Sequence, residues 1–346
     1  MMRYFKNNIT TNYYKTIKIN ADYGMDLVAM RYPVRLTNYY ADLIKRPGDA
    51  IWKQCMPDVR ELEDHYQSPD PLDESALSPI PCLIHRYPDR AVLLVSNRCP
   101  VYCRFCMRKR LVGGGDAPMS DDDLQNALNY IAANSSIHDI ILSGGDPLML
   151  DDESLLKILT GLRKIPHVAI IRIGTRMPVT LPERITPQLC TLLKKYHPLY
   201  INTHFNHPDE ITEASSKACA LLADAGIQLG NQTVLLRGVN DSIDTMQRLN
   251  TGLLAIRVRP YYLHQMDLVQ GTAHFRTSVS TGLEIIRGLR GHISGLAVPH
   301  YVIDLPGGKG KVAILPDDVE VNGTTLQIRT YTGELVTYQD IITPQE

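Results

Sequence analysis

Short apolar runs rich in β-branched residues recur through the middle of the chain. The last five of the six begin roughly 30 residues apart, which is the length of one strand, one helix and their connections. Polar, glycine-rich segments follow several of these runs, so each is read as a short strand. The predicted strands cover residues 91–95, 139–142, 168–173, 199–203, 227–234 and 256–262.

The intervals between these runs carry helical patterns with clear start signals. Ser120 precedes three aspartates and an apolar face at positions 124, 127, 128 and 131. Asp151 opens a second helix, and a third covers residues 210–225 and ends at Gly226. Strands that alternate with helices predict an α/β fold with a parallel sheet. The pattern leaves open whether this sheet is doubly wound or a barrel or partial barrel.

The two ends of the chain look different from this middle part. The first 80 residues mix short helical patterns with turns at 46–49 and 68–71 and predict a helical cap. After about residue 280 a helix is followed by β-rich stretches, which predict an appended lobe. We therefore expect a cap at 1–80, an α/β core at 81–279 and a C-terminal lobe at 280–346.

Composition excludes few function classes, but it bears on the partners and the cellular location to be expected. The chain has 346 residues, of which 44% are hydrophobic and 21% charged, and its formal net charge is -1, so nothing favours nucleic acid or membrane as a partner. No signal peptide and no apolar stretch of about 18 residues is present in the sequence. Seven cysteines, three of them crowded together, do not resemble a secreted disulfide framework, so a cytoplasmic location is expected.

Three of the cysteines form the clearest chemical motif. Cys99, Cys103 and Cys106 directly follow the first predicted strand. Three thiolates can hold a four-iron cluster and leave one iron open for a substrate. A structural zinc ion would need a fourth ligand, and neither His85 nor His138 has the spacing of a zinc finger. An iron–sulfur cluster is therefore favoured over a zinc site or simple packing cysteines.

The second predicted strand ends in another motif, Ser143-Gly144-Gly145-Asp146. Glycines at this place let a ligand approach the backbone closely, although a tight turn alone would also use them. Together with the cysteine triplet, this motif resembles the radical S-adenosylmethionine superfamily over roughly residues 85–275. The resemblance implies a partial (β/α)6 barrel and a 4Fe–4S cluster. It also implies that S-adenosylmethionine, bound near the Gly-Gly-Asp turn, is cleaved to a 5′-deoxyadenosyl radical.

From about residue 84 onward the chain is similar to lysine 2,3-aminomutase and its relatives. This family combines the radical cofactor with pyridoxal 5′-phosphate (PLP) and moves an amino group between neighbouring carbons. The resemblance implies an isomerase that converts L-lysine to L-β-lysine, an electron donor such as flavodoxin or ferredoxin, and a homo-oligomer. It is carried, in order, by residues 85–90, 102–110, 202–208, 260–262, 271–276, 290–295 and 304–311.

The glycine-rich segment near residue 310 is the expected PLP attachment site. Three glycines beside Lys309 and Lys311 suit a loop that accommodates a phosphate, and a PLP lysine must be able to lose its proton. Without the resemblance, a surface turn with two solvated lysines would be the simpler interpretation. The family's lysine aligns with Lys311, and Lys309 is the rival. Arg86, Tyr87 and Arg90 match a segment that contributes to the PLP pocket.

The resemblance also implies how a substrate is held. Arg108 matches the arginine that binds the substrate carboxylate, and Asp267 and Asp304 match the pair that holds the side-chain ammonium. Two buried carboxylates are costly without a cation, so lysine is favoured, with arginine or a lysine of elongation factor P as alternatives. His204 and Gln232 match positions near S-adenosylmethionine. The last cysteine is Cys219, so the C-terminal zinc site of some relatives is not expected.

Overall fold

The computed structural model describes residues 24–64, 67–112, 119–322 and 324–339. A nine-stranded sheet forms its centre, with β1 (Leu83–Tyr87), β2 (Arg90–Ser96), β3 (Asp139–Gly144), β4 (Ile170–Gly174), β5 (Leu199–Thr203), β6 (Gln228–Leu235), β7 (Arg259–Gln265), β8 (His300–Leu305) and β9 (Gly310–Ala313). The strands follow one another in chain order. β2 to β8 run parallel, and β1 and β9 lie antiparallel at the two edges.

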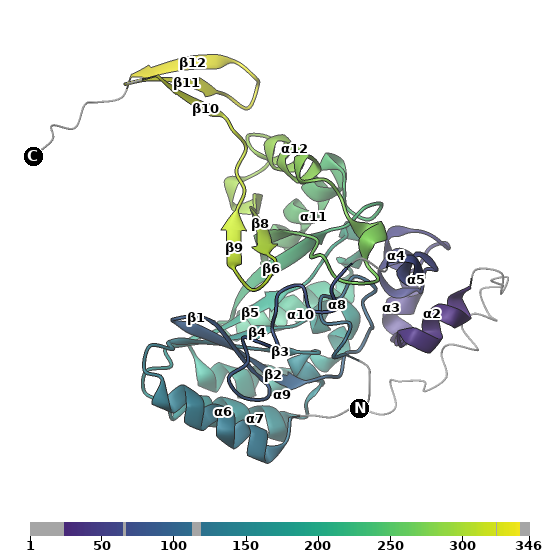
Figure 1. Cartoon of the computed structure of the whole chain (residues 1–346), viewed down its shortest axis with the longest axis vertical. Coiled ribbons are helices and arrows are strands. Elements are labelled where there is room, and N and C mark those ends of the chain that lie inside the picture. Colours follow the sequence, from purple (N-terminus) through teal and green to yellow (C-terminus); the bar gives the residue numbers. More distant parts are fainter. Residues whose placement is uncertain (1–23, 65–66, 113–118, 323, 340–346) are drawn as a thin grey trace, which may run out of the picture.

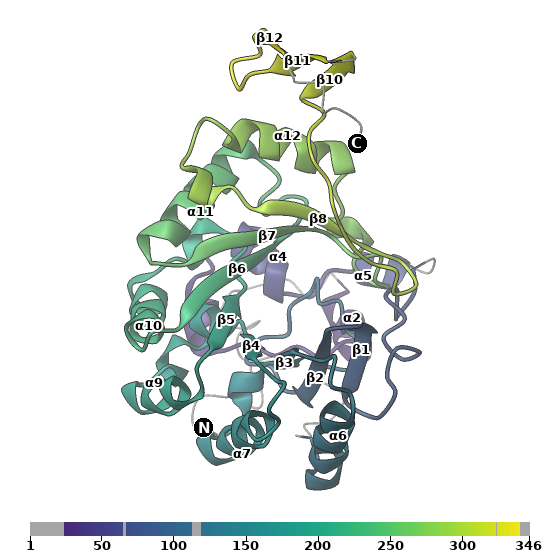
Figure 2. The same ribbon diagram turned by 90° about the vertical axis from the view of Figure 1, so that its left-hand side faces the viewer.

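The sheet curves into a nearly closed partial barrel (Figure 2). Its two edges approach each other where the hydroxyl of Tyr87 on β1 accepts a hydrogen bond of 2.8 Å from the backbone N–H of Lys311 on β9. Gly310 lies beside this contact, where a Cβ atom would come within 3.3 Å of the Tyr87 hydroxyl, and its φ of 97° also favours glycine. The expected partial barrel is therefore confirmed.

Helices cover the outer face of the barrel between consecutive strands (Figure 2). Ser120 accepts a hydrogen bond from the backbone of Asp123, and Asp151 accepts one from Ser154, so both expected helix starts are confirmed. The third expected helix begins later, because Thr212 caps it and a 3-10 turn precedes it. The helices on the outer face are α6 (Asp121–Ala133), α7 (Asp152–Arg163), α9 (Pro187–Leu193), α10 (Glu213–Asp224), α11 (Ile243–Ala255) and α12 (Val279–Leu289). The short α8 (Met177–Thr180) follows β4, and its Thr180 carbonyl accepts a hydrogen bond of 2.6 Å from the hydroxyl of Thr37.

The six strands expected from the apolar runs all form, as β2 to β7. β7 begins at Arg259 and not near residue 256, because α11 continues to Ala255 and Arg257 then takes a left-handed conformation. The sheet also includes β8 and β9 from the expected C-terminal lobe. The boundary at residue 280 stays a prediction, but the barrel sheet runs across it.

Side chains along each strand point alternately to the hydrophobic core and to the barrel interior. On β3, Ile140 and Leu142 are fully buried in the main hydrophobic core, whereas Ile141 and Ser143 line an interior cavity. On β4, Arg172 lines the same cavity. Because successive side chains of a strand point to opposite faces, polar groups on these strands collect inside the barrel. The interior is therefore where the fold places candidate functional residues.

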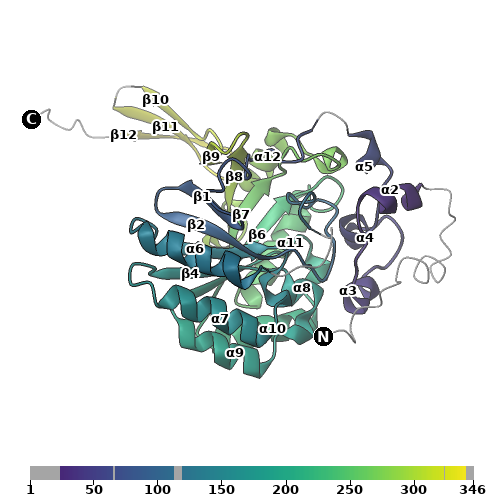
Figure 3. The same ribbon diagram turned by 60° about the horizontal axis from the view of Figure 1, so that its bottom comes forward.

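Two described segments near the ends of the chain lie outside the barrel. In the described part of the expected cap, from residue 24 on, four short helices lie beside the barrel, away from α6 and α7 (Figures 1 and 3): α2 (Met25–Arg31), α3 (Asn38–Asp42), α4 (Ala50–Cys55) and α5 (Arg60–Glu63). A separate antiparallel sheet of β10 (Val319–Asn322), β11 (Thr325–Arg329) and β12 (Leu335–Gln339) stands apart from the barrel beyond α12 (Figure 1). Among the residues described, no helix is long and apolar enough to cross a membrane.

Candidate active site

The three expected cluster cysteines lie together in the loop after β2. Cys99, Cys103 and Cys106 line one cavity of about 250 Å³. Burial raises the pKa of Cys99 and raises that of Cys106 to about 11, so both thiols need a bound metal to ionise near neutral pH. In the described ranges no three Cys, His, Asp or Glu side chains converge on a single metal ion. Three thiols on one cavity wall are a donor set that fits an iron–sulfur cluster.

The Gly-Gly turn after β3 packs directly against the cysteine loop. A Cβ atom at Gly144 would overlap the carbonyl oxygen of Ser96, and one at Gly145 would overlap that of Arg98. The φ of Gly144 is 120°, in the region that favours glycine. The glycines are therefore required for the two loops to touch. The close approach expected from the sequence is made to the protein's own backbone, and the turn then lines the cysteine cavity.

Asp146, which the sequence places in this motif, is tied to the neighbouring strand. Its buried carboxylate accepts hydrogen bonds from the Thr175 hydroxyl at 2.7 Å, the Arg176 backbone N–H at 2.8 Å and the Leu148 backbone N–H at 3.0 Å. Burial raises the pKa of Asp146 while these three donors lower it. Asp146 thus joins the turns after β3 and β4 on the wall of the cysteine cavity.

Lys311 lines a second interior cavity, of about 680 Å³. Its Nζ contacts the Asp304 carboxylate, lies 3.3 Å from Nδ1 of His264 and is 5.3 Å from the ring centre of Tyr262. β8 and β9 pair Asp304 directly with Lys311, which explains their contact. Lys309 is exposed in the turn between these strands. Of the two candidate lysines, only Lys311 therefore reaches a cavity.

Electrostatics at Lys311 favour a charged Asp304 and a neutral His264. Burial raises the pKa of Asp304, but the hydrogen bond with His264 and the charge of Lys311 together hold it below its ordinary value. Burial lowers the pKa of His264, and Lys311 lowers it further. At pH 7 the carboxylate is therefore ionised and the imidazole is neutral.

The expected PLP-pocket residues line this second cavity. Arg86 forms an ion pair of 3.4 Å with Asp304, and the guanidinium of Arg90 lies 4.5 Å from the ring centre of Tyr87. All three residues come from the hairpin of β1 and β2. Arg172, which the sequence analysis did not select, adds a further cation to the same cavity. These cations could bind a phosphate group.

Arg108 is held by a partner that the sequence did not reveal. Its Nε donates to Oε2 of Glu74 at 3.0 Å and its Nη2 donates to Oε1 at 2.7 Å, while Nη1 donates to the Ser143 hydroxyl at 3.0 Å. Glu74 lies in an irregular segment before β1, where no periodic pattern marks it. A guanidinium has five N–H donors, and these contacts use one each on Nε, Nη1 and Nη2. One N–H on each terminal nitrogen therefore remains for a second carboxylate.

Asp267, His204 and Gln232 also reach the cysteine cavity. Burial and the charge of Asp304 raise the pKa of Asp267 to about 7. His204 packs beside Phe105 with ring centres 5.5 Å apart, and burial holds its pKa well below the ordinary value. Its Nε2 is buried without a hydrogen-bond partner among the described residues, which suits a polar ligand in this cavity.

The two cavities adjoin each other. Six residues line both: Met107, Arg108, Ser143, Gln232, His264 and Asp304. The structure therefore brings every site residue expected from the sequence, apart from Lys309, to one joined interior space. One end carries the three thiols and the other carries Lys311.

Comparison with known proteins identifies the family. Residues 93–249 match the radical SAM superfamily, and residues 286–344 match the C-terminal part of lysine-2,3-aminomutase. The L-lysine 2,3-aminomutase of Fusobacterium nucleatum is 51% identical over 309 residues, which cover 88% of this chain and 73% of that protein. The same enzyme of Clostridium subterminale is 50% identical, covering 89% of this chain and 75% of that protein. The chain belongs to the lysine 2,3-aminomutase family of radical S-adenosylmethionine enzymes.

This radical SAM aminomutase is an isomerase that moves an amino group within one molecule. Membership in the superfamily implies a 4Fe–4S cluster and S-adenosylmethionine. The family also includes a glutamate 2,3-aminomutase, from Clostridioides difficile, that is 45% identical and covers 90% of this chain and 75% of that protein. Identity alone therefore leaves the amino acid substrate of this aminomutase open.

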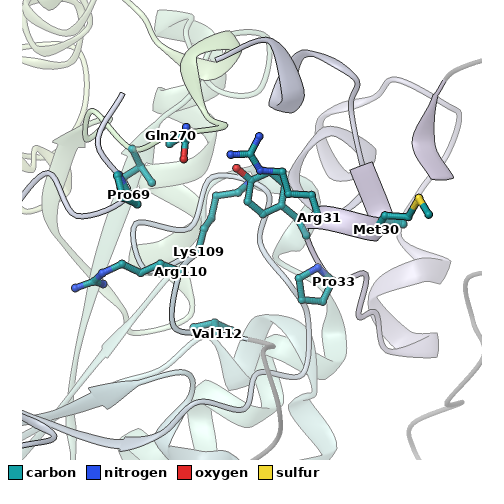
Figure 4. Close-up of a pocket in the computed structure, with 11 residues that line it drawn as sticks. Met30, Arg31, Pro33, Pro69, Lys109, Arg110, Val112 and Gln270 are labelled. Carbon is teal, nitrogen blue, oxygen red and sulfur yellow. The ribbon is translucent and has the colours of Figure 1, made fainter. Parts of the chain in front are cut away.

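A third pocket of the aminomutase lies between residues 29–33 of the cap and residues 109–112, which follow the cysteine loop (Figure 4). Lys109 points toward the cap here, where its Nζ donates to Glu61 at 2.7 Å and lies 4.3 Å from the ring centre of Tyr32. Burial lowers the pKa of Lys109 to about 8, although Glu61 opposes this shift. Arg110 points away from Lys109 in Figure 4 and pairs with Asp70 at 2.7 Å. These contacts fasten the end of the cysteine loop to the segments around it.

Proposed function

We propose that this aminomutase converts L-lysine to L-β-lysine and carries PLP on Lys311. The observation that supports this most is the arrangement in the joined cavity. The Lys311 amine, Arg108 and two carboxylates surround a space that adjoins the three thiols. A radical formed at the thiol end would need no passage through solvent to reach a substrate at the lysine end.

The residues around Lys311 fit PLP. Arg86, Arg90 and Arg172 would hold the phosphate, and the stacked rings of Tyr261 and Tyr262, 3.8 Å apart, offer an aromatic wall. PLP bound there supplies an electrophilic carbonyl for the substrate's α-amine and a conjugated ring that stabilises a neighbouring radical. Lys311 must be uncharged to react, and the neutral His264, whose Nδ1 lies 3.3 Å from Nζ of Lys311, adds no positive charge of its own to this pocket.

We infer that the two ends of the substrate are held by opposite charges. Arg108 binds the α-carboxylate through its free edge, with Glu74 and Ser143 fixing the guanidinium plane. Asp267 and Asp304 bind the side-chain ammonium, whose charge offsets the cost of ionising the buried Asp267 beside the charged Asp304. A glutamate side chain would bring a third negative charge to the same place. The acids therefore favour lysine, and arginine is the second candidate because it satisfies the same pair.

For the thiol end, we propose that Cys99, Cys103 and Cys106 ligate the cluster. Ser143, Gly144, Gly145, Asp146, His204 and Gln232 would then form the pocket for S-adenosylmethionine, since all six line the cysteine cavity. The unpartnered Nε2 of His204 supports a polar ligand there.

An anaerobic assay tests the substrate. Enzyme with a reconstituted cluster is incubated with S-adenosylmethionine, PLP, a reductant and one amino acid at a time, and products are separated by chromatography. We expect β-lysine from L-lysine and no product from L-glutamate. Turnover of glutamate, of arginine alone, or only of a lysine within elongation factor P would overturn the lysine assignment while leaving the family unaffected.

Two partners are also proposed. A low-potential one-electron donor of the flavodoxin or ferredoxin type would reduce the cluster. Self-association is supported by the separate C-terminal sheet, whose apolar side chains Val319, Val321, Leu335, Val336 and Tyr338 are exposed in the single chain. Light scattering of the full chain tests this: we expect a mass of at least twice the 38.8 kDa of one chain, and a mass of 38.8 kDa would contradict self-association.

A further inference from the structure

A buried arginine touches one of the cluster cysteines. Arg176 lies between β4 and α8, and its Nη1 donates a hydrogen bond of 3.0 Å to Sγ of Cys103. Only 7% of this arginine is exposed. Arg104 provides a contrast, since it is adjacent to Cys103 in sequence but pairs with Glu61 at 2.6 Å. The contact with the thiol thus belongs to the arginine that is distant in sequence.

Several elements fix the direction of the Arg176 side chain. Nη2 donates to Oε1 of Glu210 and to Oε1 of Gln54, both at 2.6 Å, and to the Tyr40 hydroxyl at 3.0 Å. Nε donates to the backbone carbonyl of His204 at 3.1 Å. Tyr40 and Gln54 come from α3 and α4 of the N-terminal cap. The cap therefore holds the guanidinium against Cys103.

Among the described residues, Glu210 forms the ion pair with Arg176, through Nη2 and not through the Nη1 that meets the thiol. Glu210 is fully buried, and its Oε2 accepts hydrogen bonds from the backbone of Asn206 at 2.6 Å and His207 at 3.0 Å. These donors keep Glu210 from turning toward the cysteine loop. As a result, the positive end of the ion pair faces the cysteine cavity.

We propose that Arg176 is a positioning residue that fixes Cys103 and makes the cluster easier to reduce. The cluster accepts one electron from a low-potential one-electron donor and passes from the 2+ to the 1+ state. A hydrogen bond and a positive charge at a ligand sulfur stabilise the state with the extra electron, which raises the reduction potential. This inference rests on Cys103 being a cluster ligand, and it does not depend on which amino acid is the substrate.

The test is a potentiometric titration of the reconstituted enzyme, followed by electron paramagnetic resonance of the reduced cluster. For Arg176→Met we expect a midpoint potential more negative than that of the wild type at equal iron and sulfide content. Arg176→Lys keeps the charge but loses the fork of donors and should lie in between. Arg184→Met is the matched control, because Arg184 is also largely buried but bonds to Leu148, Leu150 and Asp152. Its midpoint should equal that of the wild type.

Identical midpoints for Arg176→Met and the wild type would overturn the proposal, as would an equal shift in the Arg184→Met control. Should Arg176→Met not retain a cluster, Glu210→Gln decides, because it leaves the guanidinium in place and removes its balancing charge. The midpoint potential of Glu210→Gln must then be less negative than that of the wild type, and an unchanged midpoint potential contradicts the proposal. A wild-type protein that takes up no iron would refute the assignment of Cys103 itself, which is a distinct failure.

Discussion

The two ends of the joined cavity are built in different ways. At the thiol end, the cysteine loop and the Gly-Gly turn follow the neighbouring strands β2 and β3, and His204, Gln232 and Asp267 join them from farther along the chain. The lysine end joins opposite edges of the sheet. Tyr87 and Lys311, which are 224 positions apart, meet only because β1 and β9 approach each other. Local loops therefore form one end, while closure of the barrel forms the other.

This difference predicts that the two ends can be disabled separately. A substitution of Lys311 should leave the cluster intact, because Lys311 lines the second cavity and is not among the residues that line the cysteine cavity. A substitution in the cysteine loop should likewise leave PLP bound. The following variants test this separation, from the largest expected effect to the smallest.

Lys311→Ala should remove the visible absorbance of bound PLP and lower kcat by at least ~10³-fold, because the attachment point is lost. The electron paramagnetic resonance signal of the reduced cluster should remain. Lys309→Ala is the matched control, since Lys309 is exposed on the turn. If Lys309→Ala loses the absorbance and Lys311→Ala keeps it, the assignment is wrong.

Asp267→Asn should raise KM for lysine about 10- to 100-fold, because a neutral amide attracts the ammonium less strongly than a carboxylate. In the wild type the pKa of Asp267 is about 7, so this group is protonated below that pH and ionised above it. We therefore expect kcat/KM for lysine to rise about tenfold between pH 6 and 8 and this rise to flatten in the variant. Asp244→Asn, on the exposed surface, is the control; an equally steep rise in Asp267→Asn would exclude Asp267 as the titrating group.

Glu74→Gln should raise KM for lysine about 3- to 10-fold and change kcat little, because Arg108 loses a charged partner that orients it. Steady-state kinetics measure both constants, and the exposed Glu63→Gln serves as control. A lower KM would mean that Glu74 competes with the substrate carboxylate and does not orient Arg108.

Tyr87→Phe should have the smallest effect, because it removes one hydrogen bond between the sheet edges, worth about 0.5–1.5 kcal/mol. We expect PLP to bind a few-fold more weakly and the cluster signal to stay unchanged. Titration with PLP measures the first and spin quantitation the second. A loss of cluster in Tyr87→Phe would show that the two ends are not independent.

The sequence predicts the thiol end more completely than the lysine end, because loops after neighbouring strands carry sequence motifs and the closure of the barrel does not. The cysteine spacing and the Gly-Gly turn are local signals, and both motifs lie where strand ends were expected. The sequence could not separate Lys309 from Lys311, because only the pairing of β8 with β9 places Lys311 beside Asp304. Resemblance to the family supplied Arg86, Asp267 and Asp304, which no local pattern distinguishes from surface charges.

Some residues were missed for physical reasons. Arg172 and His264 lie on the interior face of β4 and β7, so strand alternation could have found them once the strands were placed. Glu74 lies in an irregular segment whose position depends on its contacts. Arg176 meets Cys103 only in the folded chain, where Glu210, the His204 carbonyl and two cap residues direct its side chain. No periodic signal marks either of these two residues in the sequence.

The central claim is that a radical made at the thiol end acts on lysine held at the other end. Turnover of L-lysine carrying deuterium at C3 tests it most directly, with mass spectrometry of the recovered S-adenosylmethionine and β-lysine. The account predicts deuterium at the 5′ carbon of S-adenosylmethionine and at C2 of β-lysine. It would be contradicted if S-adenosylmethionine were consumed while all of the deuterium stayed at C3 of lysine.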